Sequence, residues 1–226
     1  MRALRMSKSV RNYPNVVSRV DGWRVALLSM PRVQLSRAWT RDIPAARLRR
    51  TTLSSAPKLL EAVGHLYTHN RYTRKNGFPS LYLSDGVSTA AAEVFGADAV
   101  RSGPLGTPER SRLSLRVQAH LPDVVDLTDS DNRASLGVTL EDLTEPVRPL
   151  EVDFLNRFPG YELPQCLGEL ANDLGIGAVQ YPSAPATRAG LMGSNVVIFV
   201  DNLAATGGWY EAEEPVSGQI ERWPPT

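Results

Sequence analysis

Segments with helical periodicity and segments with strand periodicity follow one another irregularly along this chain of 226 residues. The predicted strands are residues 23–29, 80–84, 113–119, 124–127, 176–181 and 195–200. The predicted helices are residues 55–67, 88–96, 136–143 and 164–174. A parallel α/β fold needs regular strand–helix–strand alternation, which this order lacks. We therefore predict an α+β fold, in which a compact mixed sheet is flanked by helices.

The composition is that of a soluble globular protein. Hydrophobic residues make up 42% of the chain and charged residues 22%, while 17 Gly and 17 Pro keep the elements short. No apolar run approaches the roughly 18 to 20 residues that a membrane-spanning helix needs, and the first residues lack a secretory signal. We expect a cytoplasmic protein without a membrane partner. The single cysteine, Cys166, lies at an apolar helical position and is predicted to be a core residue.

Charge is distributed unevenly along the chain. Residues 1–50 contain eleven Arg and one Lys against two Asp, a net charge of +10, and the other 176 residues contain 13 basic and 22 acidic side chains, a net charge of −9. Such an asymmetry favours either a polyanionic partner or an electrostatic partner within the same chain. On this basis we predict three parts: a basic N-terminal extension of irregular structure (1–45), one folded domain (46–203) and a polar C-terminal tail (204–226).

Common catalytic and metal-binding motifs are weak in this sequence. His65 and His69 have a spacing found in zinc sites, but no Glu and no Cys ligand accompany them. His120 has no nucleophile beside it in a recognisable motif, and neither a phosphate-binding P-loop nor a G-x-G-x-x-G turn follows a predicted strand. We predict no metal site.

Polar residues do gather around the predicted strand at 80–84. Arg71 and Tyr72 precede it, Tyr82 lies within it, and Glu93 is on the helix that follows. Residue types alone favour a surface arginine, a core tyrosine and a solvated glutamate. Glu93, however, follows an alanine run that is expected to pack, and an ionised carboxylate against such a face needs a partner.

The segment RYTRKNGFPSLYLSDGVSTAAAEV, residues 71–94, resembles the core motif of the RES-domain family, the toxins of RES–Xre toxin–antitoxin modules. Three later segments resemble further family motifs in the same order. They are VVDLTD followed by LGVTLEDL, then ELPQCLGELANDLGIGAVQYPSA, and finally NVVIF. The resemblance covers about residues 48–202.

The resemblance implies a fold similar to that of ADP-ribosyltransferases and an enzyme that consumes NAD. The nicotinamide–ribose bond would be cleaved by hydrolysis or phosphorolysis, or ADP-ribose would be transferred to a host protein. NAD would be a substrate, and no metal is implied. The implied partner is an Xre-type antitoxin, which would provide any contact with DNA. The oligomeric state, including a homo-oligomer, stays open.

The resemblance also implies roles for individual residues. Glu93 would stabilise the oxocarbenium-like charge that develops when nicotinamide leaves. Tyr82 would stack on nicotinamide or position the ribose, and Ser183 would contact the ribose or the acceptor. Tyr72 and Asn195 are lesser candidates for binding NAD.

The arginine of the family motif is either one of the pair Arg49/Arg50 or Arg71, and it would bind the pyrophosphate, because guanidinium makes bidentate contacts. Pro185 stands where the family often has an arginine, so this phosphate contact is either shifted to Arg188 or lost. Arg49 and Arg50 would then form a positive wall of the NAD pocket, folded back on an acidic body. A rival hypothesis from another class is a non-catalytic protein whose basic first 50 residues bind nucleic acid.

Overall fold

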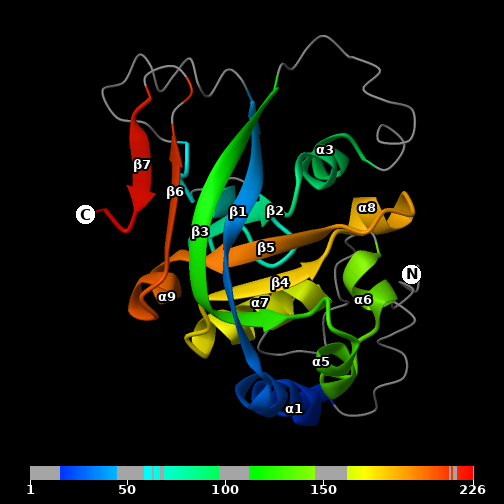
Figure 1. Ribbon diagram of the computed structural model, residues 1–226. Coiled ribbons are helices and arrows are strands. Elements are labelled where there is room, and N and C mark those ends of the chain that lie inside the picture. Colours follow the sequence, from blue (N-terminus) through cyan, green and yellow to red (C-terminus); the bar gives the residue numbers. More distant parts are fainter. Residues whose placement is uncertain are drawn as a thin grey trace.

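The computed structural model describes residues 16–44, 59–62, 64–66, 69–96, 112–145, 162–213, 215 and 218–225 (Figure 1). Its sheet has the strand order β1-β2-β5-β4-β3-β6-β7. The strands are β1 (Arg32–Pro44), β2 (Ser80–Ser84), β3 (Arg112–Asp126), β4 (Ala178–Pro182), β5 (Ser194–Phe199), β6 (Trp209–Glu213) and β7 (Ile220–Trp223). Neighbouring strands are antiparallel except β3 and β4, which are parallel.

The strand β1 closes part of this sheet into a ring. It pairs with β3 along its length, from Arg32 opposite Val125 to Pro44 opposite Arg112, and it also pairs with β2 where Thr40 lies opposite Ser84. The strands β1, β2, β5, β4 and β3 therefore form a closed ring, while β6 and β7 extend the sheet outward from β3. Figure 1 shows β1 and β3 as two long strands that cross β4 and β5 steeply.

Short helices surround the sheet. They are α1 (Val16–Ser29), the 3₁₀ turn η2 (Gly64–Leu66), α3 (Val87–Phe95), α5 (Ser130–Ser135), α6 (Leu140–Thr144), α7 (Leu163–Asp173), α8 (Ala184–Arg188) and α9 (Val200–Ala205). In Figure 1, α3, α8 and α6 follow one another down one side of the molecule, and α1 lies below the sheet. The predicted α+β class, with a mixed sheet and flanking helices, is confirmed. None of the described helices is long and apolar enough to span a membrane.

Two hydrophobic cores lie on opposite faces of the sheet. The strand β5 contributes to both, because Val196 and Ile198 belong to the core enclosed by the ring, whereas Val197 and Phe199 pack with α7 and α1 on the outer face. This double burial explains the uninterrupted apolar sequence of β5. Cys166 of α7 is fully buried in the outer core, as predicted.

The predicted strand at 23–29 is wrong, because these residues belong to α1. Trp23, Leu27 and Met30 are buried at the three- and four-residue spacing of one helix face, and the Trp23 indole N–H donates to the Leu136 carbonyl at 2.9 Å. The irregular structure predicted for the basic N-terminal part is likewise wrong for residues 16–44, which form α1 and β1. The residues before 16 lie outside the described chain.

The predicted helix at 55–67 is wrong where the structure describes it. Leu59 and Leu60 form a turn, and only the 3₁₀ turn η2 follows. The backbone N–H groups of Leu59 and Leu60 donate to the Glu221 carboxylate at 2.6 and 3.0 Å, while both side chains are buried. A contact with β7, distant in sequence, thus overrides the local helical periodicity. Residues 55–58 lie outside the described chain.

Other departures concern loops and the C-terminal part. The loop predicted between the last two strands contains α8, and the two strands predicted at 113–119 and 124–127 are a single strand, β3. The part predicted as a polar C-terminal tail contains β6 with Trp209 and β7 with Trp223, and Trp223 stacks on Tyr210 with ring centroids 5.6 Å apart. The strand β1 lies before the predicted domain limit at residue 46, and β6 and β7 lie after the limit at residue 203, yet all three belong to the same sheet as β2 to β5. The strands predicted at 80–84 and 195–200 and the helix predicted at 164–174 are confirmed within a residue or two.

Candidate active site

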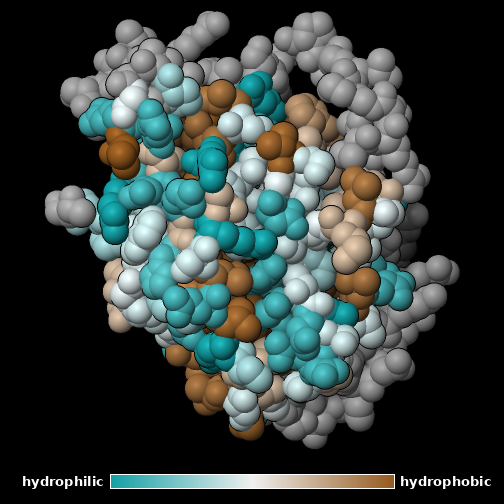
Figure 2. All heavy atoms as spheres, in the orientation of Figure 1, coloured by the Kyte–Doolittle hydropathy of each residue, from teal (hydrophilic) through white to brown (hydrophobic). Residues whose placement is uncertain are grey.

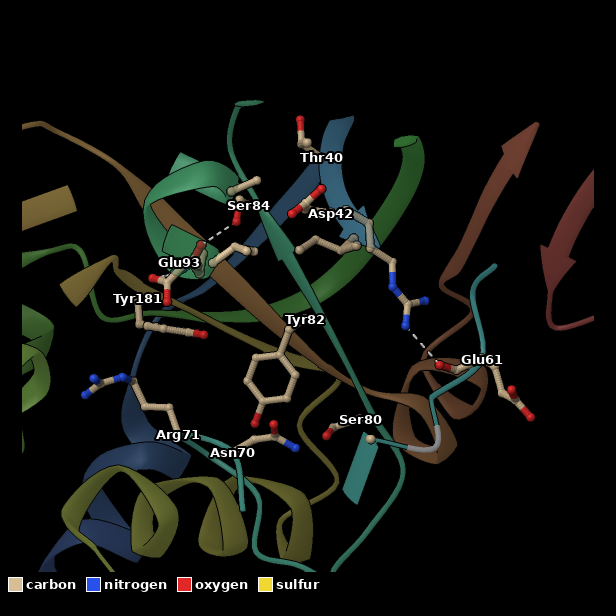
Figure 3. Close-up of a pocket in the computed structure, with 16 residues that line it drawn as sticks. Thr40, Asp42, Glu61, Asn70, Arg71, Ser80, Tyr82, Ser84, Glu93 and Tyr181 are labelled. Carbon is tan, nitrogen blue, oxygen red and sulfur yellow. Dashed lines mark hydrogen bonds between the residues drawn. The ribbon is translucent and has the colours of Figure 1, made fainter. Parts of the chain in front are cut away.

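A cavity of about 360 Å³ opens beside the strand β2, between α3, β1 and the loop before β2 (Figure 3). Its walls combine hydroxyl, amide, carboxylate and guanidinium groups with two tyrosine rings. The lining residues are Thr40, Arg41, Asp42, Glu61, Gly64, Asn70, Arg71, Ser80, Tyr82, Leu83, Ser84, Ala90, Glu93, Val94, Tyr181 and Asn195. The cavity is within the usual size range of small-molecule sites.

One row of side chains across the sheet forms much of the cavity wall. Thr40 of β1 lies opposite Ser84 of β2, Ser84 lies opposite Asn195 of β5, and Asn195 lies opposite Tyr181 of β4. Side chains opposite one another on neighbouring strands are about 5 Å apart at their Cβ atoms. The register of four strands therefore brings together residues that are distant in sequence.

Glu93 extends from α3 toward this row. Its Oε1 accepts hydrogen bonds from the Ser183 hydroxyl at 2.7 Å and from the Asn195 amide Nδ2 at 2.6 Å. Among the described residues Oε2 has no hydrogen-bond partner, and Glu93 as a whole is exposed at the cavity. The sequence predicted that the Glu93 carboxylate needs a partner, and its partners are two neutral donors, the Ser183 hydroxyl and the Asn195 amide. They fix one oxygen and leave the other free to face a ligand.

Ser183 does not line the cavity. It is fully buried as the N-cap of α8, where its Oγ accepts from the Ala186 N–H at 3.3 Å and donates to Glu93. The direct ribose contact expected of Ser183 therefore has no support in this geometry, because the hydroxyl is already used on both sides. The Ser183 hydroxyl instead fixes one oxygen of the Glu93 carboxylate.

A glycine lets the helix that carries Glu93 approach the loop before β5. A Cβ atom added at Gly193 would lie 2.6 Å from the Thr89 Oγ1 of α3 and 3.1 Å from the Ala186 Cβ of α8. Thr89 is buried and has little room to move. The lack of a Cβ atom at Gly193 therefore allows α3 to lie close to both α8 and β5. Ser183 and Asn195 reach Glu93 from these two elements.

The tyrosines at the site lie in two layers. Tyr82 and Tyr181 line the cavity, whereas Tyr72 is fully buried behind Tyr181, with ring centroids 4.4 Å apart. The Tyr82 hydroxyl accepts from the Tyr72 backbone N–H at 3.1 Å and is hydrogen-bonded to Thr73 Oγ1 at 3.0 Å. Tyr72, a predicted NAD-binding residue, thus supports the wall and does not form it.

Burial of these rings predicts an alkaline limit to stability. Burial raises the pKa of Tyr82 to about 12 from its ordinary value of 10, although the hydrogen bond with Thr73 acts in the opposite direction. Burial also raises the pKa of Tyr181. The unfolded state releases these protons first, so stability is complete below pH 10 and is lost as the pH rises toward 12. We expect the melting temperature to fall in this window.

Tyrosinate absorbance provides the independent check. The titration of the buried tyrosines should occur only together with unfolding, above the ordinary tyrosine pKa of about 10. If all seven tyrosines titrate near pH 10 in a protein that is still folded, the expected burial is contradicted.

The predicted arginines have different outcomes. Arg71 lines the cavity and its Nη1 donates to the Leu143 carbonyl at 2.8 Å, with longer contacts to the Glu145 carbonyl at 3.4 and 3.5 Å. The end of α6 thereby fixes this guanidinium. Arg188 donates to the Thr144 carbonyl at 3.0 Å and does not line the cavity, so a phosphate contact shifted to Arg188 has no support. Arg49 and Arg50 lie outside the described residues.

Sequence reasoning missed several lining residues. Arg41 of β1 donates to the Glu61 carbonyl at 3.0 Å, the contact drawn as a dashed line at Glu61 in Figure 3. Asp42 forms an ion pair with Arg112. Tyr181 lies in the segment ELPQCLGELANDLGIGAVQYPSA and is the last residue of the strand predicted at 176–181. That position at a strand end was the signal that could have identified it.

His69 and His120 do not line the cavity. His69 Nδ1 accepts from the Lys75 backbone N–H at 3.4 Å, and His120 Nδ1 is hydrogen-bonded to Ser36 Oγ at 2.6 Å across β1 and β3. Within the part of the chain that the structure describes, no three His, Cys, Asp or Glu side chains form a group able to hold a metal ion.

Comparison with known proteins places this site in a family context. The fold is similar to a chain in the crystal structure of the M. tuberculosis MbcT–MbcA toxin–antitoxin complex, with a TM-score of 0.53, 16% sequence identity, and coverage of 89% of each chain. A search of curated proteins found no match. The family model described as RES domain matches residues 44–213, which contain Glu93, Ser183, the strands β2, β4 and β5, and the lining residues of the cavity other than those on β1. This chain therefore belongs to the RES-domain family.

Proposed function

We propose that this protein is an NAD-consuming toxin that cleaves the bond between nicotinamide and ribose. The observation that carries the proposal is the Glu93 carboxylate, whose Oε1 is held by Ser183 and Asn195 while Oε2 is left free at a cavity with two tyrosine rings. A fixed carboxylate of this kind suits a reaction in which positive charge develops on a sugar.

In the proposed reaction, the bond between ribose C1′ and the nicotinamide nitrogen breaks, and its electron pair leaves with neutral nicotinamide. The ribose then has oxocarbenium character, which Glu93 stabilises through its negative charge. A water molecule or a phosphate ion attacks C1′, and water loses a proton in forming ADP-ribose. Tyr82 and Tyr181 offer aromatic faces to the nicotinamide ring, since both side chains line the same cavity as Glu93 (Figure 3).

The pyrophosphate of NAD would bind to Arg71 and Arg41. A guanidinium has five N–H donors in a planar fork, so the carbonyl contacts that fix Arg71 leave further donors for an anion. Arg41 lines the same cavity from β1. Asp42 is neutralised by its ion pair with Arg112, which reduces the repulsion of a phosphate at this wall. Arg49 or Arg50 would add to this binding.

An antitoxin is the proposed protein partner, in parallel with the toxin–antitoxin complex of the similar structure, and an Xre-type protein is proposed from the family resemblance. Exposed apolar side chains near the cavity support a protein partner. Val87 and Phe95 of α3 and Leu191 and Met192 after α8 are 41% to 102% exposed, and Figure 2 shows apolar surface in this region.

The alternative of a nucleic-acid-binding arm has less support. In the described part of this segment, Arg32 forms an ion pair with Asp123 of the acidic part at 2.9 Å. Arg37 lies over the ring of Trp39 within the segment. Part of the charge asymmetry is therefore matched inside the chain. DNA would be contacted indirectly, through the antitoxin.

The test is to mix the purified protein with NAD, with and without phosphate, and to measure free nicotinamide. Phosphorolysis requires phosphate and yields a phosphorylated ADP-ribose, whereas hydrolysis yields ADP-ribose in either buffer. Label from the adenylate half of NAD that stays on a protein band would instead identify mono-ADP-ribosylation. If the wild type releases no more nicotinamide than Glu93→Ala in any of these conditions, the proposed function is wrong.

A further inference from the structure

We propose that Ser84 is a positioning residue, which acts through Asn195 to hold the Glu93 carboxylate in place. This inference rests on the proposed function. Ser84 Oγ donates to Asn195 Oδ1 at 2.8 Å, and Asn195 Nδ2 donates to Glu93 Oε1 at 2.6 Å. One hydroxyl therefore connects the strand β2 to the carboxylate on α3 through a single amide.

The hydrogen bond between Ser84 and Asn195 is buried. Ser84 is 7% exposed and Asn195 3% exposed, whereas Glu93 is open to the cavity. A buried amide oxygen without a donor is costly, so Asn195 keeps its orientation only while Ser84 donates to Oδ1. With Oδ1 held, Nδ2 points to Glu93. If the amide turned round, its oxygen would face the negative carboxylate.

The sheet register makes Ser84 a rigid anchor. Ser84 lies opposite Thr40 on one side and opposite Asn195 on the other. The five-pair ladder between β2 and β5 places its backbone, so its hydroxyl has a fixed distance to the Asn195 amide. Ser183 holds Glu93 from α8 by a second, separate contact. Loss of Ser84 should thus weaken the position of the carboxylate without releasing it fully.

The test compares Ser84→Thr with Ser84→Val, two variants of equal size that differ in the hydroxyl. We expect Ser84→Thr to keep kcat for nicotinamide release within about twofold and Ser84→Val to lower it about tenfold, which is the expected effect of one unsatisfied buried acceptor. The KM for NAD should change less than about twofold, because the effect lies on the carboxylate and not on binding. Thermal unfolding checks that both variants are folded.

A double-mutant cycle identifies the route. In an Asn195→Ala background, the Thr and Val variants of Ser84 should have equal kcat, since the connecting amide is gone. A difference that persists in this background would show that Ser84 contacts substrate directly and would overturn the proposal. Equal activity of Ser84→Thr and Ser84→Val in the otherwise wild-type protein would overturn it as well.

A readout without NAD separates this proposal from the proposed function. The side-chain NH₂ of Asn195 should give a distinct, slowly exchanging NMR signal that Ser84→Thr retains and Ser84→Val and Glu93→Ala lose. If the wild type proves inactive on NAD but this pattern holds, the proposed function fails and the positioning contact stands. If the signal is the same in Ser84→Val, the positioning contact fails, whatever the activity.

Discussion

Nicotinamide release by Glu93→Gln should be 10² to 10³ times slower than release by the wild type, by about the effect of removing one group that stabilises transition-state charge. Glutamine keeps the shape of glutamate, and its oxygen can still accept from Ser183 and Asn195. What it loses is the negative charge beside the developing oxocarbenium centre. The measurement is kcat for nicotinamide release at saturating NAD.

Glu141→Gln is the matched control for this substitution. Glu141 is an exposed residue of α6 that does not line the cavity, so the same chemical change there should leave kcat unaltered. If Glu93→Gln retains more than about a tenth of the wild-type kcat, transition-state stabilisation by this carboxylate is refuted.

Gly168→Ala should be among the most destabilising single substitutions in the molecule. A Cβ atom added to Gly168 of α7 would lie 2.1 Å from the Tyr72 carbonyl oxygen, which is backbone and has no free rotation to escape. Either α7 or the segment with Arg71 and Tyr72 must shift, and both are packed. We expect a loss of about 3 kcal/mol or more in the free energy of unfolding, measured by urea denaturation.

Gly22→Ala provides the control of opposite sign. Gly22 is an exposed residue of α1, and an added Cβ would meet nothing within 4 Å. Alanine stabilises a helix interior relative to glycine by about 0.5 to 1 kcal/mol, so this variant should be slightly more stable. Equal urea midpoints for Gly168→Ala and the wild type would contradict the close approach of α7 to Tyr72.

The local sequence predicts those elements whose own pattern agrees with their surroundings. The strands β2 and β5 and the helix α7 have a clear period and clear limits, and all three are found in the structure. Residues 16–30 contain both an apolar run and a helical spacing of Trp23, Leu27 and Met30, and burial against α7 selects the helix. At Leu59 and Leu60 the carboxylate of Glu221, some 160 residues later, decides the backbone conformation.

The candidate site was accessible from the sequence only in part. Glu93 and Asn195 belong to recognisable motifs, and the structure brings them into contact. The link from Ser84 to Asn195 spans 111 residues and depends on strand register, which no local pattern specifies. Arg41 was missed because the irregular structure predicted for its segment hid the strand that places it at the cavity.

The closed ring of strands has its shortest pairing between β1 and β2. β1 and β3 are joined by a long ladder, as are β2 and β5, whereas in the described chain β1 meets β2 at the single pair Thr40 and Ser84. Both residues of this pair line the cavity. Parting β1 from β2 would therefore widen the cavity by breaking little backbone pairing, while Ser84, Asn195 and Tyr181 stay together on the other side. The ring would open between β1 and β2 at the cavity, while its other strands stay paired.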